Sequence, residues 1–352
     1  MAEKASYYPL PKTTQELYGS FHHSHIDPST FVILAGRGNE PLAEAVGELL
    51  DVDVDFPCTD FPNGETRVKI GPNLRGKEVF VINSLQPNPN RGLQETIFMG
   101  DAIKRADAKP GKVTAMLPKI AYDRQDRKPE SRTPISIAAV AAQLKFAAEY
   151  NRLFTIDLHA DQSVGSFPNA WDNVYGSKVL LPAIEALELD EPVLLAPDAG
   201  STKRARVYAE KLGSNDVAFV DKRRDKDDPY KTESFKIVGD VRGRDVLIVD
   251  DVVGSGGTLV NAANIARENG AQRIVAAATH AEFTPDKEGL TLPQKLNQPD
   301  HPLNRILITD TIFQAEDIRG NEKIDIVTVA PVLAVAILCY LTDNSISQRL
   351  IK

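Results

Sequence analysis

The sequence Val-Leu-Ile-Val-Asp-Asp-Val-Val-Gly-Ser-Gly-Gly-Thr, residues 246–258, is the stretch that decides the fold class. The four apolar, β-favouring residues at 246–249 predict a strand buried on both faces, which is typical of a parallel sheet. Asp250 and Asp251 follow at the predicted end of this strand. From Leu259 the apolar residues recur at helical spacing until Gly270, which predicts a helix directly after the loop. The order of strand, loop and helix indicates an α/β protein.

The loop between the predicted strand and helix has the composition of an anion site. Gly254, Gly256 and Gly257 permit a tight turn with positive φ, while Ser255 and Thr258 add hydroxyl groups to the backbone amides. The loop also leads into a helix N-terminus, where the first amides have no partner within the helix. We therefore expect a phosphate group to bind there.

The two carboxylates need a different ligand, because acids beside a phosphate site repel further phosphate unless they bind hydroxyl groups or a cation. Vicinal hydroxyls of a ribose meet this need. The stretch thus predicts a site for a 5-phosphorylated pentose, with Asp250 and Asp251 on the 2- and 3-hydroxyls. The alternative is an ordinary strand-to-helix turn of any α/β enzyme. The dinucleotide-binding pattern G-x-G-x-x-G does not occur in the sequence, which argues against a dinucleotide-binding fold.

Composition narrows the class of protein. With 352 residues, 42% of them hydrophobic and 26% charged, the chain is long enough for two domains of ordinary size. No apolar run approaches the roughly 20 residues of a membrane span, and the start lacks an apolar secretory signal. The net charge of −8 argues against nucleic acid as a partner. Cys58 and Cys339 give no disulfide framework, so we expect a cytoplasmic protein without a membrane partner.

Strand and helix patterns alternate along the chain, which predicts mostly parallel sheets flanked by helices. We expect an arm at 1–30, an N-terminal α/β domain at 31–172 and a C-terminal α/β domain at 173–330. A very apolar helix at 331–340 must be buried against another domain or another subunit, and the segment 331–345 is expected to join the N-terminal domain. The expected strands are 31–34, 52–56, 66–70, 78–82, 112–118, 154–158, 193–196, 217–220, 246–249, 305–309 and 324–329.

Several predicted strands end in charged residues. His159 and Asp198 each follow an apolar strand, and side chains at the carboxyl ends of parallel strands share one edge of a sheet. Together they are candidates for holding a divalent cation. The basic segment 122–134 is either a solvated surface loop or a clamp for a polyphosphate.

Six motifs, in order, carry a resemblance to a known family. They are Phe-Pro-Asn-Gly-Glu at 61–65, Tyr-Asp-Arg-Gln-Asp-Arg at 122–127, Asp-Leu-His at 157–159, Pro-Asp-Ala-Gly at 197–200, Val-Asp-Lys-Arg-Arg at 220–224 and the stretch 246–258. Over residues 31–343 the chain resembles the ribose-phosphate diphosphokinases, also called phosphoribosyl pyrophosphate synthetases. The resemblance implies two similar α/β domains of the phosphoribosyltransferase type. It also implies synthesis of phosphoribosyl pyrophosphate and AMP from ribose 5-phosphate and ATP, with Mg²⁺.

The resemblance further implies roles for single residues. The adenine of ATP would meet three residues of a neighbouring subunit, Phe61, Asn63 and Glu65, with Arg124 and Gln125 on its other side. Mg²⁺ would be linked to His159 and Asp198, and the transferring phosphates to Lys222, Arg224 and Arg127. Asp250 and Asp251 would hold the ribose hydroxyls, and the 5-phosphate would lie on Ser255, Gly256, Gly257 and Thr258. A shared ATP site implies a homo-oligomer, specifically a homohexamer built from dimers.

The chain departs from the family pattern at three places. Gly254 stands where the loop usually carries an acid. The run 119–121 and Asp123 stand where the family usually has an aromatic, glycine-containing run and a small residue, and the segment 285–304 is longer than usual. Two alternatives follow. One is a catalytically silent, regulatory homologue that assembles with an active synthetase, which Gly254 favours; the other is a phosphoribosyltransferase, which would lack the motifs at 61–65 and 124–125.

Overall fold

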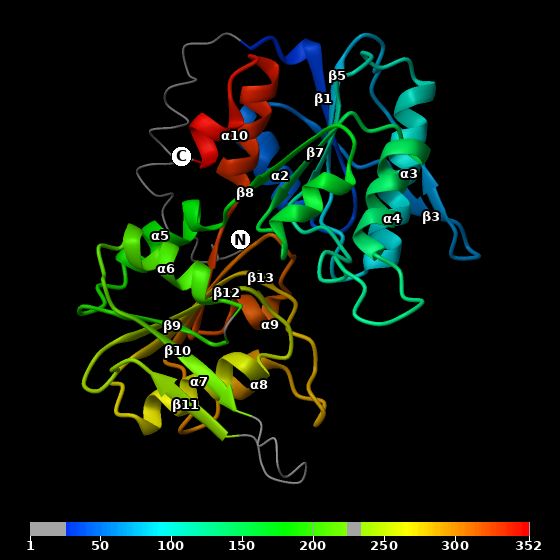
Figure 1. Cartoon of the computed structure of the whole chain (residues 1–352). Coiled ribbons are helices and arrows are strands. Elements are labelled where there is room, and N and C mark those ends of the chain that lie inside the picture. The colour runs from blue at the N-terminus through cyan, green and yellow to red at the C-terminus, as the bar shows by residue number, and fades with distance from the viewer. Residues whose placement is uncertain (1–25, 199, 224–233, 352) are drawn as a thin grey trace. The chain divides into compact units, whose positions relative to one another are not determined.

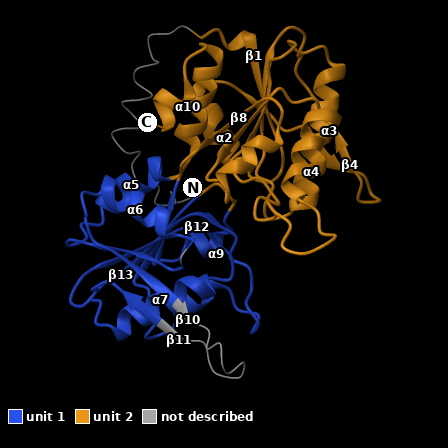
Figure 2. Cartoon of the chain, viewed as in Figure 1, with its two compact units in different colours: residues 1–11, 177–309, 314–327 blue, residues 12–176, 310–313, 328–352 orange. Residues whose placement is uncertain are grey.

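The computed structural model describes residues 26–198, 200–223 and 234–351, without the side chains of residues 222, 223, 234 and 235. The chain divides into two compact units (Figure 2). The N-terminal unit contains the described residues up to 176, together with 310–313 and those from 328 onwards. The C-terminal unit contains residues 177–309 and 314–327. The domain limits proposed from the sequence, 172 and 330, lie a few residues from these bounds.

The N-terminal unit is built on a six-stranded parallel sheet with the order β2-β1-β5-β6-β7-β8 (Figure 1). Its strands are β1 (Phe31–Ala35), β2 (Val54–Asp55), β5 (Glu78–Ile82), β6 (Val113–Leu117), β7 (Arg152–Ile156) and β8 (Ala170–Val174). The helices and short 3₁₀ or π turns are α2 (Glu40–Leu50), α3 (Pro89–Arg105), α4 (Ser136–Ala142), α10 (Ala330–Leu341), η1 (Pro28–Thr30), η2 (Gln143–Ala147), η3 (Asp161–Ser166) and η4 (Ser347–Ile351). All residues of β5 are buried, as its apolar sequence predicts for an interior strand.

A small hairpin stands apart from this sheet. β3 (Cys58–Asp60) and β4 (Thr66–Val68) pair antiparallel with each other and form a two-stranded sheet of their own. The predicted strand at 66–70 is present as β4, but it pairs antiparallel with β3 and is not part of the parallel sheet. Cys58 is the only buried residue of β3, and no residue of β4 is fully buried. Both strands therefore lack the continuous buried apolar run that a central strand of a parallel sheet needs.

The apolar helix α10 is buried within the N-terminal unit. Every residue from Ala330 to Tyr340 is buried, and the helix packs against α2. Near its end, the Tyr340 ring stacks on Phe80 of β5 with centroids 6.2 Å apart, and its hydroxyl donates to Asp172 Oδ2 at 2.7 Å. Packing inside this unit thus accounts for the apolar sequence. Within the described residues, no helix has both the length and the apolar character needed to cross a membrane.

The C-terminal unit is built on a seven-stranded sheet with the order β11-β10-β9-β12-β13-β14-β15. Only the edge strand β11 runs antiparallel to its neighbour. The strands are β9 (Val193–Ala196), β10 (Val217–Arg223), β11 (Ser234–Val238), β12 (Val246–Val253), β13 (Ile274–Ala281), β14 (Arg305–Thr309) and β15 (Ile324–Val327). The helices are α5 (Ser177–Glu185), α6 (Thr202–Lys211), α7 (Gly257–Glu268), α8 (Leu292–Leu296) and α9 (Glu316–Arg319). The predicted fold class, α/β with mostly parallel sheets flanked by helices, is confirmed.

The central strand β12 is longer than its apolar run. It pairs with β13 as far as Val253, but with β9 only as far as Ile248. The prediction that the strand ends at residue 249 is therefore wrong, because β13 continues the ladder on one side after β9 has ended on the other. Asp250 and Asp251 lie in this final part of β12, which is paired with β13 and extends beyond the end of β9.

Candidate active site

Asp250 and Asp251 are held together by a shared arginine. Arg204, on α6, donates through one nitrogen, Nη1, to Asp250 Oδ1 at 3.2 Å and to Asp251 Oδ1 at 3.1 Å. The backbone N–H of Asp251 donates to Asp250 Oδ1 at 2.9 Å. Asp251 is 4% exposed, so the pair is largely removed from water. The contact of Arg204 with both acids was not predicted from the sequence.

Burial and mutual repulsion alter the acidity of this pair. Burial raises the pKa of Asp250 to about 7, and the hydrogen bond with Asp251 and its negative charge add to the effect, while Arg204 opposes it. A carboxyl pair in this state is stabilised by groups that donate hydrogen bonds to both of its members. Vicinal hydroxyls are such donors, so the chemistry of the pair suits a sugar diol.

The glycine loop joins β12 to α7. Gly256 has φ 78° and caps the 12-residue helix α7, whereas Gly254 and Gly257 are not among the glycines with positive φ. The prediction of positive φ is thus confirmed at one of the three glycines. A Cβ on Gly256 would lie 3.0 Å from Leu292 of α8, inside the long segment 285–304. Gly257 and Thr258 are exposed in the first turn of the helix, where backbone amides can receive an anion.

Asp198 follows β9 on the same sheet. Its Oδ1 accepts hydrogen bonds from both the backbone N–H and the hydroxyl of Ser201, each at 2.9 Å, at the start of α6. Because β9 lies between β10 and β12, Asp198 and the Asp250–Asp251 pair share the carboxyl edge of neighbouring strands. Lys222 is in β10, where its backbone is in register with Phe235 of β11. The Lys222 side chain and Arg224 lie outside the described part of the chain.

In the N-terminal unit, three predicted ATP-binding residues occupy the turn of the β3–β4 hairpin. Phe61 N donates to Glu65 O at 2.8 Å, and Glu65 N donates to Asn63 Oδ1 at 3.1 Å, so Phe61, Asn63 and Glu65 are brought together. Phe61 is 47% exposed, and the guanidinium of Arg67 lies 5.8 Å from the centre of its ring. The turn therefore presents an aromatic face that a planar base can stack on.

The base of this hairpin is fixed by a network of charged groups. Asp60 accepts two hydrogen bonds from Arg37, both at 2.8 Å, and one from Arg91 at 2.8 Å. Both arginines also donate to Glu95 of α3, which is 1% exposed. The hydrogen bond and charge of Arg37 lower the pKa of Asp60. Sequence reasoning missed this network, because its members come from three separate segments: Arg37, Asp60 and the helix α3.

The loops after β6 and β7 are linked to each other. Arg124, Gln125 and Arg127 are exposed in the loop after β6, and Gln125 Oε1 accepts the Ser136 hydroxyl at 2.6 Å. His159, also exposed, follows β7, and its backbone N–H donates to Asp123 Oδ2 at 3.4 Å. The structure therefore brings the nucleotide motif and the histidine motif together through Asp123.

His159 belongs to the N-terminal unit and Asp198 to the C-terminal unit. Among the described residues, no three His, Cys, Asp or Glu side chains gather into a ready-made metal site. One imidazole and one carboxylate do not form a cage, but Mg²⁺ usually keeps several waters and binds to one or two carboxylates plus substrate phosphates. The Asp198 carboxylate, taken by itself, is a donor of this kind, and the His159 imidazole is a nitrogen donor.

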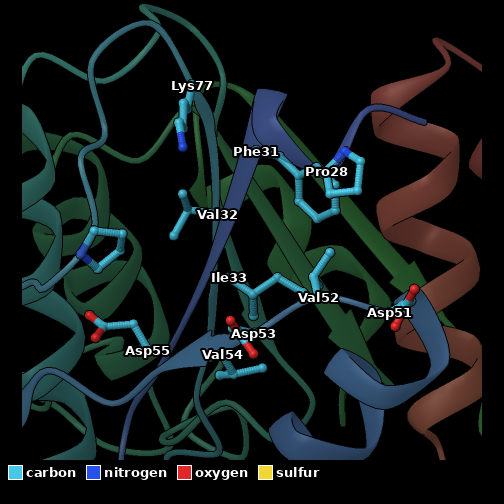
Figure 3. A pocket seen from close by; sticks show the side chains of 11 residues that line it. Pro28, Phe31, Val32, Ile33, Asp51, Val52, Asp53, Val54, Asp55 and Lys77 are labelled. Carbon is cyan, nitrogen blue, oxygen red and sulfur yellow. The ribbon is translucent and has the colours of Figure 1, made fainter.

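A cavity of about 460 Å³ lies beside β1 and β2 in the N-terminal unit (Figure 3). Asp51, Asp53, Asp55 and Lys77 are among the residues that line it. None of the predicted site residues lines this cavity. The predicted site residues that the structure describes lie instead in the loops at the strand ends and in the β3–β4 turn.

Comparison with known proteins identifies the family to which the two α/β units belong. Residues 31–147 match the model of the N-terminal domain of ribose phosphate pyrophosphokinase, and residues 220–351 match that of the phosphoribosyl synthetase-associated domain. Ribose-phosphate pyrophosphokinases of Vibrio cholerae and Haemophilus ducreyi are each 38% identical to the chain, covering 90% of it and 97% of the relative. The crystal structure of phosphoribosylpyrophosphate synthetase from Mycobacterium smegmatis matches with a TM-score of 0.80 and 34% identity, over 90% of this chain and all of that one. The chain belongs to the ribose-phosphate pyrophosphokinase family.

Proposed function

We propose that the protein transfers the diphosphoryl group of ATP to the C1 hydroxyl of ribose 5-phosphate, giving 5-phosphoribosyl 1-pyrophosphate and AMP. The observation that carries this proposal is the continuity of the Asp250–Asp251 pair with the Gly256 turn and the N-terminus of α7. A group that binds a diol and a group that binds a phosphate stand on one strand-to-helix connection. Family membership supports the same reaction.

At the sugar end, Asp250 and Asp251 accept hydrogen bonds from the 2- and 3-hydroxyls of ribose 5-phosphate. Arg204 offsets part of the negative charge of this pair. The 5-phosphate lies against the hydroxyls and amides of the loop and the first turn of α7, contributed by Ser255, Gly256, Gly257 and Thr258.

At the nucleotide end, Arg124 and Gln125 hold ATP on one side. The exposed hairpin turn with Phe61, Asn63 and Glu65 reaches the adenine of a neighbouring subunit. This shared site makes the active protein a homo-oligomer, for which we propose a homohexamer built from dimers. Proximity of the bound substrates then converts a bimolecular encounter into a reaction within one complex.

In the transfer step, the anomeric hydroxyl attacks the β-phosphorus in line and AMP leaves, so negative charge moves to the α-phosphate. Lys222, Arg224 and Arg127 supply positive charge to the phosphates. His159 and Asp198 would hold Mg²⁺, which when bound neutralises phosphate charge. Electrostatic stabilisation and positioning account for most of the acceleration. We assign no general base.

We also propose a cytoplasmic location. Cys58 and Cys339 are both free and buried. Burial raises the pKa of the Cys58 thiol to about 12 and that of Cys339 to about 11, so both remain protonated and packed. A reducing compartment suits two such thiols.

The decisive experiment is a nucleotide assay with ATP, ribose 5-phosphate and Mg²⁺, in which each component is omitted in turn. AMP should form only when all three are present. Release of ADP would indicate transfer of a single phosphoryl group and would refute the proposal. An intact protein that forms no AMP alone, but changes the rate of an active synthetase, would instead support the regulatory alternative. Asp251→Ala should raise the KM for ribose 5-phosphate far more than the KM for ATP; equal effects would argue that the pair holds the metal.

A further inference from the structure

Lys119 and Asp123 form a buried ion pair in the N-terminal unit. Their side chains are 2% and 3% exposed, and Lys119 Nζ lies 2.7 Å from Asp123 Oδ2. Removing two charges from water costs free energy that is recovered only if the partners approach closely and in good geometry. The two side chains therefore restrict each other's position more strictly than an apolar pair of similar size would.

The pair ties together the ends of three neighbouring strands. Lys119 comes just after β6, and its carbonyl accepts the N–H of Leu85, beyond the end of β5, at 2.9 Å. Asp123 Oδ2, the atom that receives the ammonium group, also accepts the N–H of His159 beyond the end of β7, at 3.4 Å. Since β5, β6 and β7 are adjacent in the sheet, the Lys119 backbone and the Lys119–Asp123 ion pair together connect all three loops at this edge.

The backbone between the two charges is strained. Tyr122 has φ 65°, a left-handed conformation that a bulky residue adopts only where its surroundings impose it. Its carbonyl accepts the N–H of Gln125 at 3.0 Å, which closes the turn that carries Arg124. With Lys119 before this turn and Asp123 within it, the ion pair is placed to hold the strained conformation.

We propose that the Lys119–Asp123 ion pair is a positioning pair for phosphoryl transfer, which holds the turn with Arg124 and Gln125 in register with the His159 loop. The proposal rests on the proposed function. It also unites two departures from the family pattern, since the run 119–121, which begins with Lys119, and Asp123 stand where an aromatic, glycine-containing run and a small residue are usual.

The test compares Asp123→Asn and Lys119→Met with the double variant Lys119→Tyr/Asp123→Ala, which installs the family-like residues. Each single variant should lower kcat/KM for ATP about 100-fold, the scale of a displacement of roughly 1 Å in a catalytic group. The KM for ribose 5-phosphate should change less than about threefold, because its proposed ligands lie in the C-terminal unit. The kcat/KM for ATP of the double variant should be at least about tenfold higher than that of either single variant, because the effects of substitutions at contacting positions are not additive.

Lys104→Met is the matched control, because Lys104 also forms an ion pair with a carboxylate, Glu149, in the same unit, but both side chains are about half exposed. It should leave kcat/KM unchanged. Amide hydrogen exchange at 158–160 gives a readout without catalysis: Asp123→Ala should accelerate it, and Lys104→Met should not. Normal kcat/KM for ATP in folded single variants, or equal losses for both substrates, would overturn the proposal. If the wild type itself formed no AMP, the proposed function would fail, and unchanged exchange in Asp123→Ala would then refute the positioning role by itself.

Discussion

Asp250→Asn should raise the free energy of unfolding and weaken the binding of ribose 5-phosphate. In the folded protein the pKa of Asp250 is raised to about 7 from its ordinary value of 3.8, mainly by burial and then by Asp251. Between these two pH values the folded state binds this proton more tightly than the unfolded state, so the contribution of Asp250 to stability falls as the pH rises from about 4 to 7. At about 1.4 kcal/mol for each pH unit, the full cost above pH 7 is on the order of 4 kcal/mol.

An asparagine has nearly the same shape, accepts from Arg204 and Asp251 N through its Oδ1, and does not titrate. The free energy of unfolding of Asp250→Asn should therefore match that of the wild type near pH 4 and exceed it by up to about 4 kcal/mol at pH 8. Urea unfolding followed by far-ultraviolet circular dichroism, at intervals from pH 4 to 8, measures this difference. Ribose 5-phosphate should bind more weakly to the variant, because one carboxylate acceptor is lost.

Glu210→Gln, which alters an exposed carboxyl on α6, is the control and should change the free energy of unfolding by no more than about 0.5 kcal/mol. A pH-independent difference for Asp250→Asn would mean that Asp250 is ionised throughout this range. A variant that became less stable relative to wild type as the pH rose would show that Arg204 outweighs burial and Asp251. Either result would refute the electrostatic account of the pair.

Three further predictions concern other parts of the chain. Gly256→Ala places an alanine in a left-handed conformation against Leu292 and should lower the free energy of unfolding by about 2–4 kcal/mol. In Gly257→Ala the new Cβ would meet nothing closer than 3.8 Å, and the free energy of unfolding should change by no more than about 0.5 kcal/mol. Equal effects of the two substitutions in urea unfolding would contradict the assigned loop conformation. Tyr340→Phe keeps the ring on Phe80 but loses the 2.7 Å hydrogen bond to Asp172, and should cost about 1.5–3 kcal/mol by Trp171 fluorescence in urea; no loss would mean that water replaces the hydroxyl. Mixed subunits of the inactive variants Glu65→Arg and Lys222→Ala should regain part of the AMP-forming activity if the ATP site is shared, and no recovery despite exchange confirmed by mass would place both residues in one chain's site.

Local sequence was sufficient wherever one short segment carried the whole signal. The apolar run before Asp250 predicted a buried parallel strand, and the spacing of Leu259, Ala262, Ala263, Ile265 and Ala266 predicted the buried face of α7, all of which are buried. Burial of the apolar helix α10 followed from the sequence in the same way. In these cases side-chain hydrophobicity at a fixed period determines both the element and the face that it buries.

Tertiary structure decided every feature that depends on a partner distant in the sequence. β12 runs on to Val253 because β13 continues beside it, and the β3–β4 hairpin stands apart because its ladder is closed by its own two strands. Arg204 meets the acid pair across more than 40 residues, and Asp123 meets the His159 backbone across 36. The sequence by itself determined which chemical groups stand at the strand ends, because hydrophobic periodicity is local. The order of strands in the sheets decided which of those groups are in contact. Hydrogen bonds and ion pairs act over only a few ångströms, and they join segments that are far apart in the sequence.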